Sequence, residues 1–260
     1  MKGKDSSREI EFLISIEERL QNSIEFVLDQ LEVQPLTLRT DQCHPPPLTL
    51  RWQDNKLNYR SAIALFLARK HSSLASQVAA AITEKLQETI PPDFADIRCS
   101  PPAWIEFTLT EKTIQNWLEE GLQGISSLSY SLTPPETIDS FPKYVRDRCW
   151  QLLQLGIQEN FISLLHPIQQ WKTISFSTPS LLIDEDWQFL YQLILTRDGL
   201  EKVSSVQQRE KLADHLSAAF LEFHRHCQLF NRQQPHFHQL AVIRFTAIAI
   251  TERLLFDLED

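Results

Sequence analysis

The spacing of hydrophobic residues changes near residue 143. Before it, stretches with a hydrophobic residue every three or four positions, which is helical spacing, lie between short stretches of alternating or β-favouring residues. The helical stretches cover residues 8–32, 59–70, 74–89 and 111–118, and the β-type stretches cover residues 36–52, 97–99 and 104–109. This mixture predicts an α+β N-terminal module over residues 1–120.

After residue 143 the hydrophobic spacing is helical throughout. The expected helices cover residues 144–156, 160–168, 184–195, 204–230 and 240–257. The fourth carries one apolar stripe, formed by Leu212, Leu216, Phe220, Phe223, Cys227 and Phe230. The fifth is apolar on nearly all sides, which predicts the centre of a bundle. Residues 143–260 are therefore predicted to form an all-α helical bundle, joined to the first module by a Ser- and Pro-rich linker over residues 121–142.

The sequence has no place for a nucleotide-binding catalytic domain. A single β–α–β crossover needs about 30 residues, which is more than the linker holds. The chain contains only five glycines, and neither the Gly-x-Gly-x-x-Gly nor the Gly-x-x-x-x-Gly-Lys-[Ser/Thr] phosphate loop is present. We therefore expect no Rossmann-type domain, no cofactor and no enzymatic activity.

Charge and composition narrow the class of protein. The net charge is −9, and both parts are acidic: residues 1–143 hold 14 Lys and Arg against 20 Asp and Glu, and residues 144–260 hold 11 against 14. Neither part has the basic excess that is usual in a non-specific nucleic-acid binder, which argues against DNA binding and weakens the case for tRNA binding without removing it. No apolar run approaches the roughly 20 residues that span a bilayer, and the four cysteines show no Cys-x-x-Cys spacing. We expect a soluble cytoplasmic protein with reduced thiols and no membrane partner.

The densest group of potential metal ligands is formed by His224, His226, Cys227, His236 and His238. His224 and His226 are two positions apart on a predicted helix and point to nearly opposite sides, so they cannot converge on one ion. We predict no metal site. A solvated helix end is the favoured interpretation, and a partner-contacting surface is the alternative.

Two sets of motifs resemble arginyl-tRNA synthetases. In the bundle, Phe220-Leu-Glu-Phe223-His224-Arg-His226-Cys227 and the later Arg244 resemble the last two helices of the DALR anticodon-binding domain of that family. Residues 144–149 (Tyr-Val-Arg-Asp-Arg-Cys) resemble the opening of the same domain. Residues 58–65 (Asn-Tyr-Arg-Ser-Ala-Ile-Ala-Leu) and 103–107 (Ala-Trp-Ile-Glu-Phe) are similar to motifs of the family's N-terminal domain. The resemblance implies these two domains without the catalytic domain, whose His-x-Gly-His and Lys-Met-Ser-Lys-Ser signatures are absent.

The resemblance also implies RNA-contacting residues. Arg148, His224 and Arg244 match or replace residues that the family uses at the RNA face of the bundle, so they are expected to face one groove open to solvent. Trp104 and Tyr59, in the two N-terminal motifs, are further candidates. A competing interpretation is that Arg148 and Arg244 pair with acidic neighbours such as Asp147, Asp214 or Glu252 and hold the helices together.

Departures from the family pattern weaken the RNA interpretation. Ala62 and Glu106 replace the asparagines of the N-terminal motifs, and Leu221 replaces an asparagine of the bundle motif. Ala62 cannot hydrogen-bond, and Glu106 places a negative charge where RNA would lie. The hydrophobic framework is thus retained while polar RNA-reading groups are lost.

Three hypotheses follow. The first is a non-catalytic paralogue of arginyl-tRNA synthetase that binds tRNA or a tRNA-like RNA, and the second is a protein–protein adaptor built on the same scaffold. An enzyme of an unrelated class is the third. RNA binding predicts a local cluster of Lys and Arg, whereas an adaptor predicts an exposed apolar patch.

Overall fold

The computed structural model describes residues 13, 15–31, 46–68, 75–127, 137–161, 182–231, 233 and 236–259. Eight helices occur in this part: α1 (Ile16–Gln30), α2 (Ile63–Leu67), α3 (Ala75–Thr89), α4 (Glu111–Ser127), α5 (Phe141–Gln158), α7 (Asp184–Leu200), α8 (Val206–His226) and α9 (Phe237–Glu259). Four strands form an antiparallel sheet of order β1-β2-β4-β3: β1 (Thr49–Gln53), β2 (Lys56–Ser61), β3 (Ala95–Ser100) and β4 (Trp104–Leu109). The fold is α+β, as predicted. Parts of the predicted segments lie outside the described residues, namely residues 8–12, 36–45, 128–136 and 162–168.

Strands β1 and β2 form a hairpin that was not predicted from the sequence. Asp54 and Asn55 make its two-residue turn, with φ of 52° and 56°. Positive φ at both positions is the type I′ geometry, which Asp and Asn tolerate and which matches the twist of the strands. The predicted helix over residues 59–70 was wrong in its first residues, because Tyr59 lies in β2 and the short helix α2 begins at Ile63.

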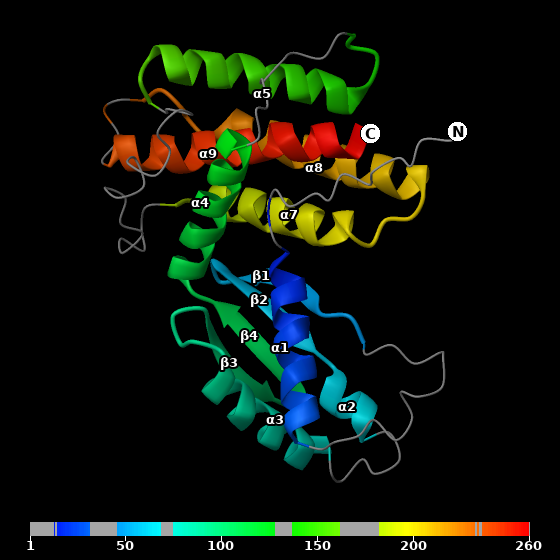
Figure 1. Ribbon diagram of the computed structural model, residues 1–260. Coiled ribbons are helices and arrows are strands. Elements are labelled where there is room, and N and C mark those ends of the chain that lie inside the picture. Colours follow the sequence, from blue (N-terminus) through cyan, green and yellow to red (C-terminus); the bar gives the residue numbers. More distant parts are fainter. Residues whose placement is uncertain are drawn as a thin grey trace.

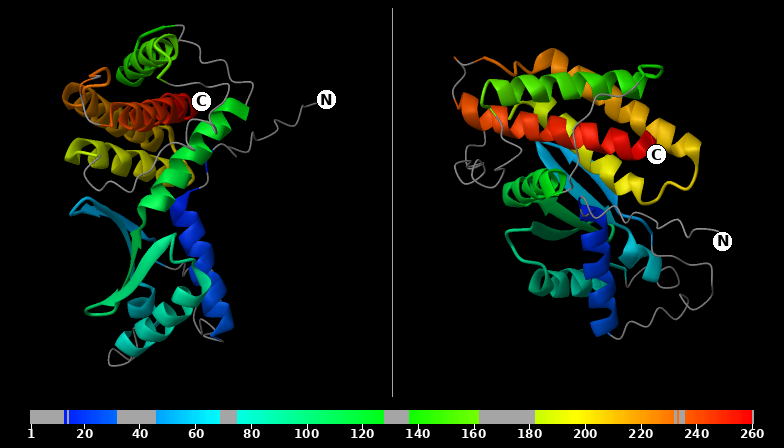
Figure 2. Two further views of the ribbon diagram at one scale, coloured as in Figure 1. Left: turned by 90° about the vertical axis from the view of Figure 1, so that its left-hand side faces the viewer. Right: turned by 45° about the horizontal axis from the view of Figure 1, so that its top comes forward.

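One face of the sheet is covered and the other is open. On β4, Ile105, Phe107 and Leu109 are buried and alternate with half-buried residues, as expected for a strand with one face against a core. Helices α1 and α3 lie on the buried side (Figure 2, left). The opposite side of the sheet carries no helix in that view.

Helix α9 is the centre of the bundle, as its all-round apolar sequence predicts. It packs against α4, α5, α7 and α8, and lies between α5 and α7 in Figure 1. The predicted stripe on α8 also faces the core, where Leu216, Phe220 and Phe223 are buried. None of the described helices is both long enough and apolar enough to cross a bilayer.

Helix α4 is longer than predicted and connects the sheet to the bundle (Figure 1). It was expected to end at residue 118, but it continues to Ser127, so residues 121–127 of the expected linker are helical. Leu122 and Ile125 are buried and extend the apolar face of the helix. Gly121 lies at a close approach to α9, where a Cβ atom would be 2.7 Å from Cδ1 of Ile250. The missing side chain at Gly121 therefore lets α4 pack closely on α9.

Candidate nucleic-acid interface

Two of the three residues predicted at the RNA face of the bundle share a groove. Arg148 on α5 and His224 on α8 line a cavity of about 410 Å³. Its other lining residues are Gln151, Leu152, Leu155, Cys227, Leu229 and Phe230. Leu155 and Phe230 are 40% and 37% exposed, so the groove opens to solvent with apolar side chains at its rim.

The polar side chains of this groove include the guanidinium of Arg148, the amide of Gln151 and the imidazole of His224. Nη1 of Arg148 donates a hydrogen bond to Oε1 of Gln151 at 3.1 Å, one turn further along α5. His224 stacks on Phe220, with ring centroids 5.9 Å apart. Burial lowers the pKa of His224 below its usual value, and the nearby Arg148 lowers it further. At neutral pH His224 therefore offers hydrogen-bonding nitrogens rather than a positive charge.

Arg244 does not face the groove, and this part of the RNA prediction was wrong. Its side chain is buried and forms two hydrogen bonds of 2.9 Å with the carboxylate of Asp186 on α7. Nη1 of Arg244 also donates to the carbonyl oxygen of Gln228, at 3.2 Å. The competing interpretation is correct for this residue: Arg244 holds α9 to α7 and to the chain that follows α8. The acidic partner, however, was not among the neighbours expected from the sequence.

Tyr59 was also wrongly predicted to contact RNA. Its side chain is fully buried on the helix-covered face of β2, and its hydroxyl donates a hydrogen bond to Oδ2 of Asp198 on α7. Oγ of Ser15, immediately before α1, donates to Oδ1 of the same carboxylate at 2.7 Å. Asp198 therefore joins the bundle to both α1 and the sheet.

The buried environment of Asp198 destabilises the charged form of its carboxyl group. Burial raises the pKa of Asp198 above its usual value, and the hydrogen bonds from Tyr59 and Ser15 lower it only in part. The pKa of Tyr59 is raised by burial and by the Asp198 charge. Because the folded-state pKa of Asp198 lies above the unfolded-state value, this group makes the fold less stable as pH rises between the two values.

The Tyr59→Phe variant tests this link between the two modules. It removes one donor from a buried carboxylate, so we expect the free energy of unfolding to fall by about 1–3 kcal/mol at neutral pH. The loss should become smaller as pH falls through the pKa of Asp198, because the protonated carboxyl needs the donor less. Urea unfolding at several pH values measures it, and a loss that grows on acidification would contradict the assignment.

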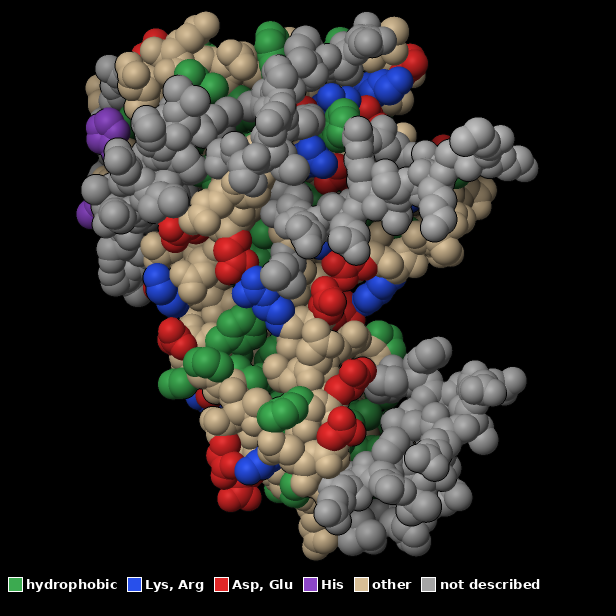
Figure 3. All heavy atoms as spheres, viewed as in Figure 1, with side chains coloured by type: hydrophobic (Ala, Val, Ile, Leu, Met, Phe, Trp, Pro, Cys, Tyr) green, Lys and Arg blue, Asp and Glu red, His purple; other side chains and the backbone are tan. Residues whose placement is uncertain are grey.

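The sheet presents a second polar surface, which we call the open face. It consists of alternate strand positions, none of them buried: Thr49, Arg51, Gln53, Lys56, Asn58, Arg60, Asp96, Arg98, Ser100, Trp104, Glu106 and Thr108. It carries four cations and two carboxylates, although the chain as a whole has a net charge of −9. On the side of the molecule that carries α1, acidic and basic side chains are interspersed (Figure 3).

Ion pairs on the open face neutralise both of its carboxylates. Nη2 of Arg60 lies 2.8 Å from Oε1 of Glu106, and Nη2 of Arg98 lies 2.6 Å from Oδ2 of Asp96. The negative charge of Glu106, which was expected to lie where RNA would bind, is thus paired with Arg60. Arg51 and Lys56 form no ion pair with the described residues, so the two remaining charges are positive.

Trp104 lies on the open face, half-buried, where it was predicted as an RNA contact. The guanidinium of Arg60 lies over its ring, 4.9 Å from the centroid. Beside this pair, Oγ1 of Thr108 donates to Oδ1 of Asn58 at 2.6 Å, across β4 and β2. The face therefore offers a planar aromatic ring, amide and hydroxyl groups and cations together.

Arg51 and Lys56 were not predicted as site residues from the sequence. The alternation of polar and apolar residues in the sequence could have identified them. Arg51, Gln53 and Lys56 alternate with the buried Leu50 and Leu57 on either side of the Asp54-Asn55 turn. A hairpin prediction at this turn would have placed both cations on one face.

Cys99, Cys149 and Cys227 are free thiols, as expected from the sequence; Cys149 and Cys227 are buried and Cys99 is exposed. Trp117 and Trp187 are buried in the core, and Trp150 is half-buried on α5. In the part of the chain that the structure describes, no three His, Cys, Asp or Glu side chains are placed to bind a metal ion.

Comparison of the chain with protein-family models, with curated proteins and with solved structures gave no match in any of the three. The resemblance to arginyl-tRNA synthetases therefore stays a prediction from the motifs quoted above.

Proposed function

We propose that this protein is a non-catalytic, arginyl-tRNA synthetase-like protein that binds tRNA or a tRNA-like RNA on the open face of its sheet. The observation that supports this most is the local charge of that face, four cations against two paired carboxylates in an acidic chain. Phosphate contacts supply much of the affinity of proteins for RNA, so the excess of positive charge on this face favours contact with a phosphate backbone.

The other groups of the open face suit unpaired nucleotides. RNA-binding sheets stack bases on aromatic side chains and hydrogen-bond to base edges with neighbouring polar groups. Trp104 supplies the ring, and Asn58 and Thr108 supply the amide and hydroxyl groups. The bundle groove, with Arg148 and His224, adds a second surface of similar chemistry on the other module.

The double variant Arg51→Ala/Lys56→Ala tests the proposal. These cations have no carboxylate partner among the described residues, so their removal should weaken total-tRNA binding without unfolding the protein. The plot of log affinity against log salt should become flatter by about one for each phosphate that the variant no longer neutralises, hence by about two. Fluorescence anisotropy with labelled total tRNA, from about 50 to 200 mM salt, measures both quantities.

The matched control is Lys85→Ala/Lys211→Ala. It removes the same charge from α3, on the other side of the sheet, and from α8. It should leave the salt dependence unchanged. Equal effects of the two double variants, or no tRNA binding by the unsubstituted protein at about 50 mM salt, would reject the open face as an RNA site.

A second candidate function is the protein adaptor. The observation that favours it is a gathering of exposed apolar side chains where the N-terminal ends of α5 and α8 meet. Exposed apolar groups that cluster, rather than lie singly, are typical of protein-binding surfaces.

A further inference from the structure

A groove lies where three helix ends of the bundle meet. Its volume is about 620 Å³, and it is bounded by the N-terminal turns of α5 and α8 and by the C-terminal turn of α9. Ala213 and Leu258 are buried side chains in its lining. It lies at the opposite ends of α5 and α8 from the groove of Arg148 and His224, so the two grooves are separate.

Large apolar side chains are exposed around this groove. Val206 and Phe141 line it and are 72% and 42% exposed. Tyr144, one turn after Phe141, and Ile138, just before α5, are 48% and 57% exposed. These are four of the eight large hydrophobic side chains that are exposed among the described residues. Such a concentration on one surface marks an unfilled contact rather than ordinary exposure.

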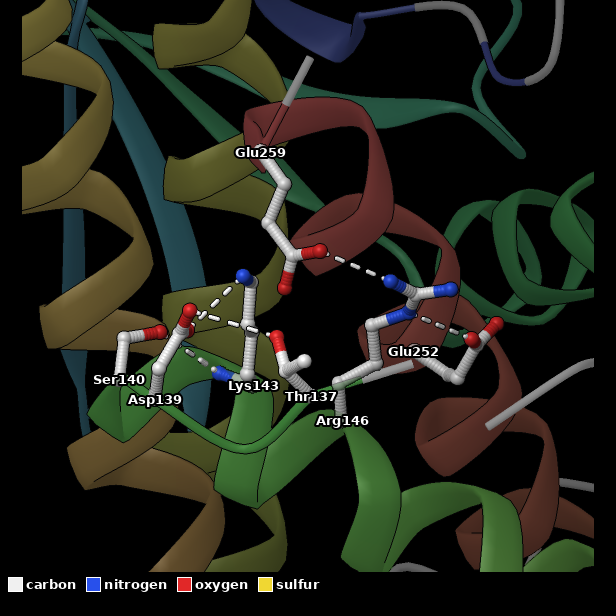
Figure 4. Close-up of polar contacts among 7 residues, drawn as sticks. All are labelled: Thr137, Asp139, Ser140, Lys143, Arg146, Glu252 and Glu259. Carbon is white, nitrogen blue, oxygen red and sulfur yellow. Dashed lines mark hydrogen bonds and ion pairs between the residues drawn. The ribbon is translucent and has the colours of Figure 1, made fainter. Parts of the chain in front are cut away.

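Two of the groove's charges are already neutralised within the protein (Figure 4). Nζ of Lys143 lies 2.8 Å from Oδ1 of Asp139, and this pairing raises the pKa of Lys143. Glu259 lies 2.8 Å from Nη1 of Arg146, whose Nε donates to Glu252. The two pairs made by Arg146 fix the end of α9 against α5.

The groove's charged side chains that have no ion-pair partner among the described residues are mainly acidic. Glu210 and Asp214 lie one turn apart on α8, both exposed, and neither pairs with a cation in the described part of the chain. Arg209 is the one cation lining the groove without such a partner among the described residues. The rim therefore repels phosphates and attracts cations placed beside an apolar contact.

We propose that this groove docks a basic amphipathic helix of a partner protein, an inference that rests on the adaptor function and names the chemistry of its partner. Apolar side chains of the helix would enter between Phe141 and Val206, as in other helix-in-groove contacts. Lysines or arginines on its flank would pair with Glu210 and Asp214. A second copy of this acidic chain fits less well, because like charges would meet at the contact.

The test uses two synthetic peptides of about 18 residues, long enough to form a helix on binding. One has Leu and Lys at amphipathic spacing, and the other has Glu in place of Lys. Fluorescence anisotropy should show the Leu/Lys peptide binding at least about tenfold more tightly than the Leu/Glu peptide. The Phe141→Ser/Val206→Ser variant should weaken Leu/Lys binding by at least about tenfold.

The matched control is Phe26→Ser/Ile183→Ser, which removes two apolar side chains that are 53% and 39% exposed elsewhere. It should bind the Leu/Lys peptide as the unsubstituted protein does. The Glu210→Gln/Asp214→Asn variant, which leaves the apolar groups intact, should weaken Leu/Lys binding and narrow the difference between the peptides. Circular dichroism checks that each variant is folded. If Phe141→Ser/Val206→Ser is unfolded, the Glu210→Gln/Asp214→Asn variant tests the proposal in its place.

Three results would overturn the proposal. They are equal binding of both peptides, equal binding by the groove and control variants, and a dimer in sedimentation that Phe141→Ser/Val206→Ser dissociates, which would make a second copy the occupant. The RNA-binding proposal is tested independently of the groove, because it depends on Arg51 and Lys56 and is measured with tRNA.

Discussion

The Arg244→Ala variant is expected to unfold more easily than the unsubstituted protein, with a loss of about 3–5 kcal/mol in the free energy of unfolding. The substitution removes one partner of a buried ion pair, and Asp186 is left charged in a site that water does not reach. The carbonyl oxygen of Gln228 also loses its donor. Equilibrium unfolding in urea measures the loss.

The double variant Arg244→Met/Asp186→Asn distinguishes the cost of an unpaired buried charge from the loss of the ion pair itself. It removes both charges and keeps an oxygen that can accept the hydrogen bond from the backbone N–H of Ile183, which Asp186 accepts at 3.1 Å. We expect it to be more stable than Arg244→Ala, because no unpaired charge remains. A loss below about 1 kcal/mol in the single variant would mean that Arg244 is not buried.

The Arg244→Ala variant also tests whether Arg244 contacts RNA. Since Arg244 is buried and does not line the groove of Arg148 and His224, folded Arg244→Ala should bind tRNA as well as the unsubstituted protein does. Selective loss of affinity without loss of stability would instead restore Arg244 as an RNA contact, as the family resemblance implies.

The helices of the bundle could be predicted because their signal is local. On α8 the residues that face the core recur every three or four positions, and burying that stripe outweighs local preferences. The all-round apolar sequence of α9 likewise indicates a helix surrounded by others. By contrast, the end of α4 was misplaced because Ser and Gly after residue 120 were interpreted as linker, although Leu122 and Ile125 continue the buried face.

The contacts that decide the site are not local, and this is why they were missed. Asp186 and Arg244 are 58 positions apart, and Asp198 and Tyr59 are 139 apart. No spacing rule connects residues on different elements, so the sequence could show that Arg244 and Tyr59 match a motif but not that they are buried. Arg148 and His224 were correctly placed in one open groove, because neither has such a buried partner.

The largest test of the bundle's packing is Phe223→Ala, which should lower the free energy of unfolding by about 3–5 kcal/mol through the cavity it leaves. Phe223 is 2% exposed, and its ring stacks on Phe189 of α7 with centroids 4.4 Å apart and planes 17° from parallel. The control is Phe26→Ala on α1, where the ring is 53% exposed and the loss should stay within about 0.5 kcal/mol. Urea unfolding of both variants measures the difference. A loss below about 1 kcal/mol for Phe223→Ala would mean that α8 presents another face to α7. The residues of α8 that line the groove with α5 would then differ from those given above.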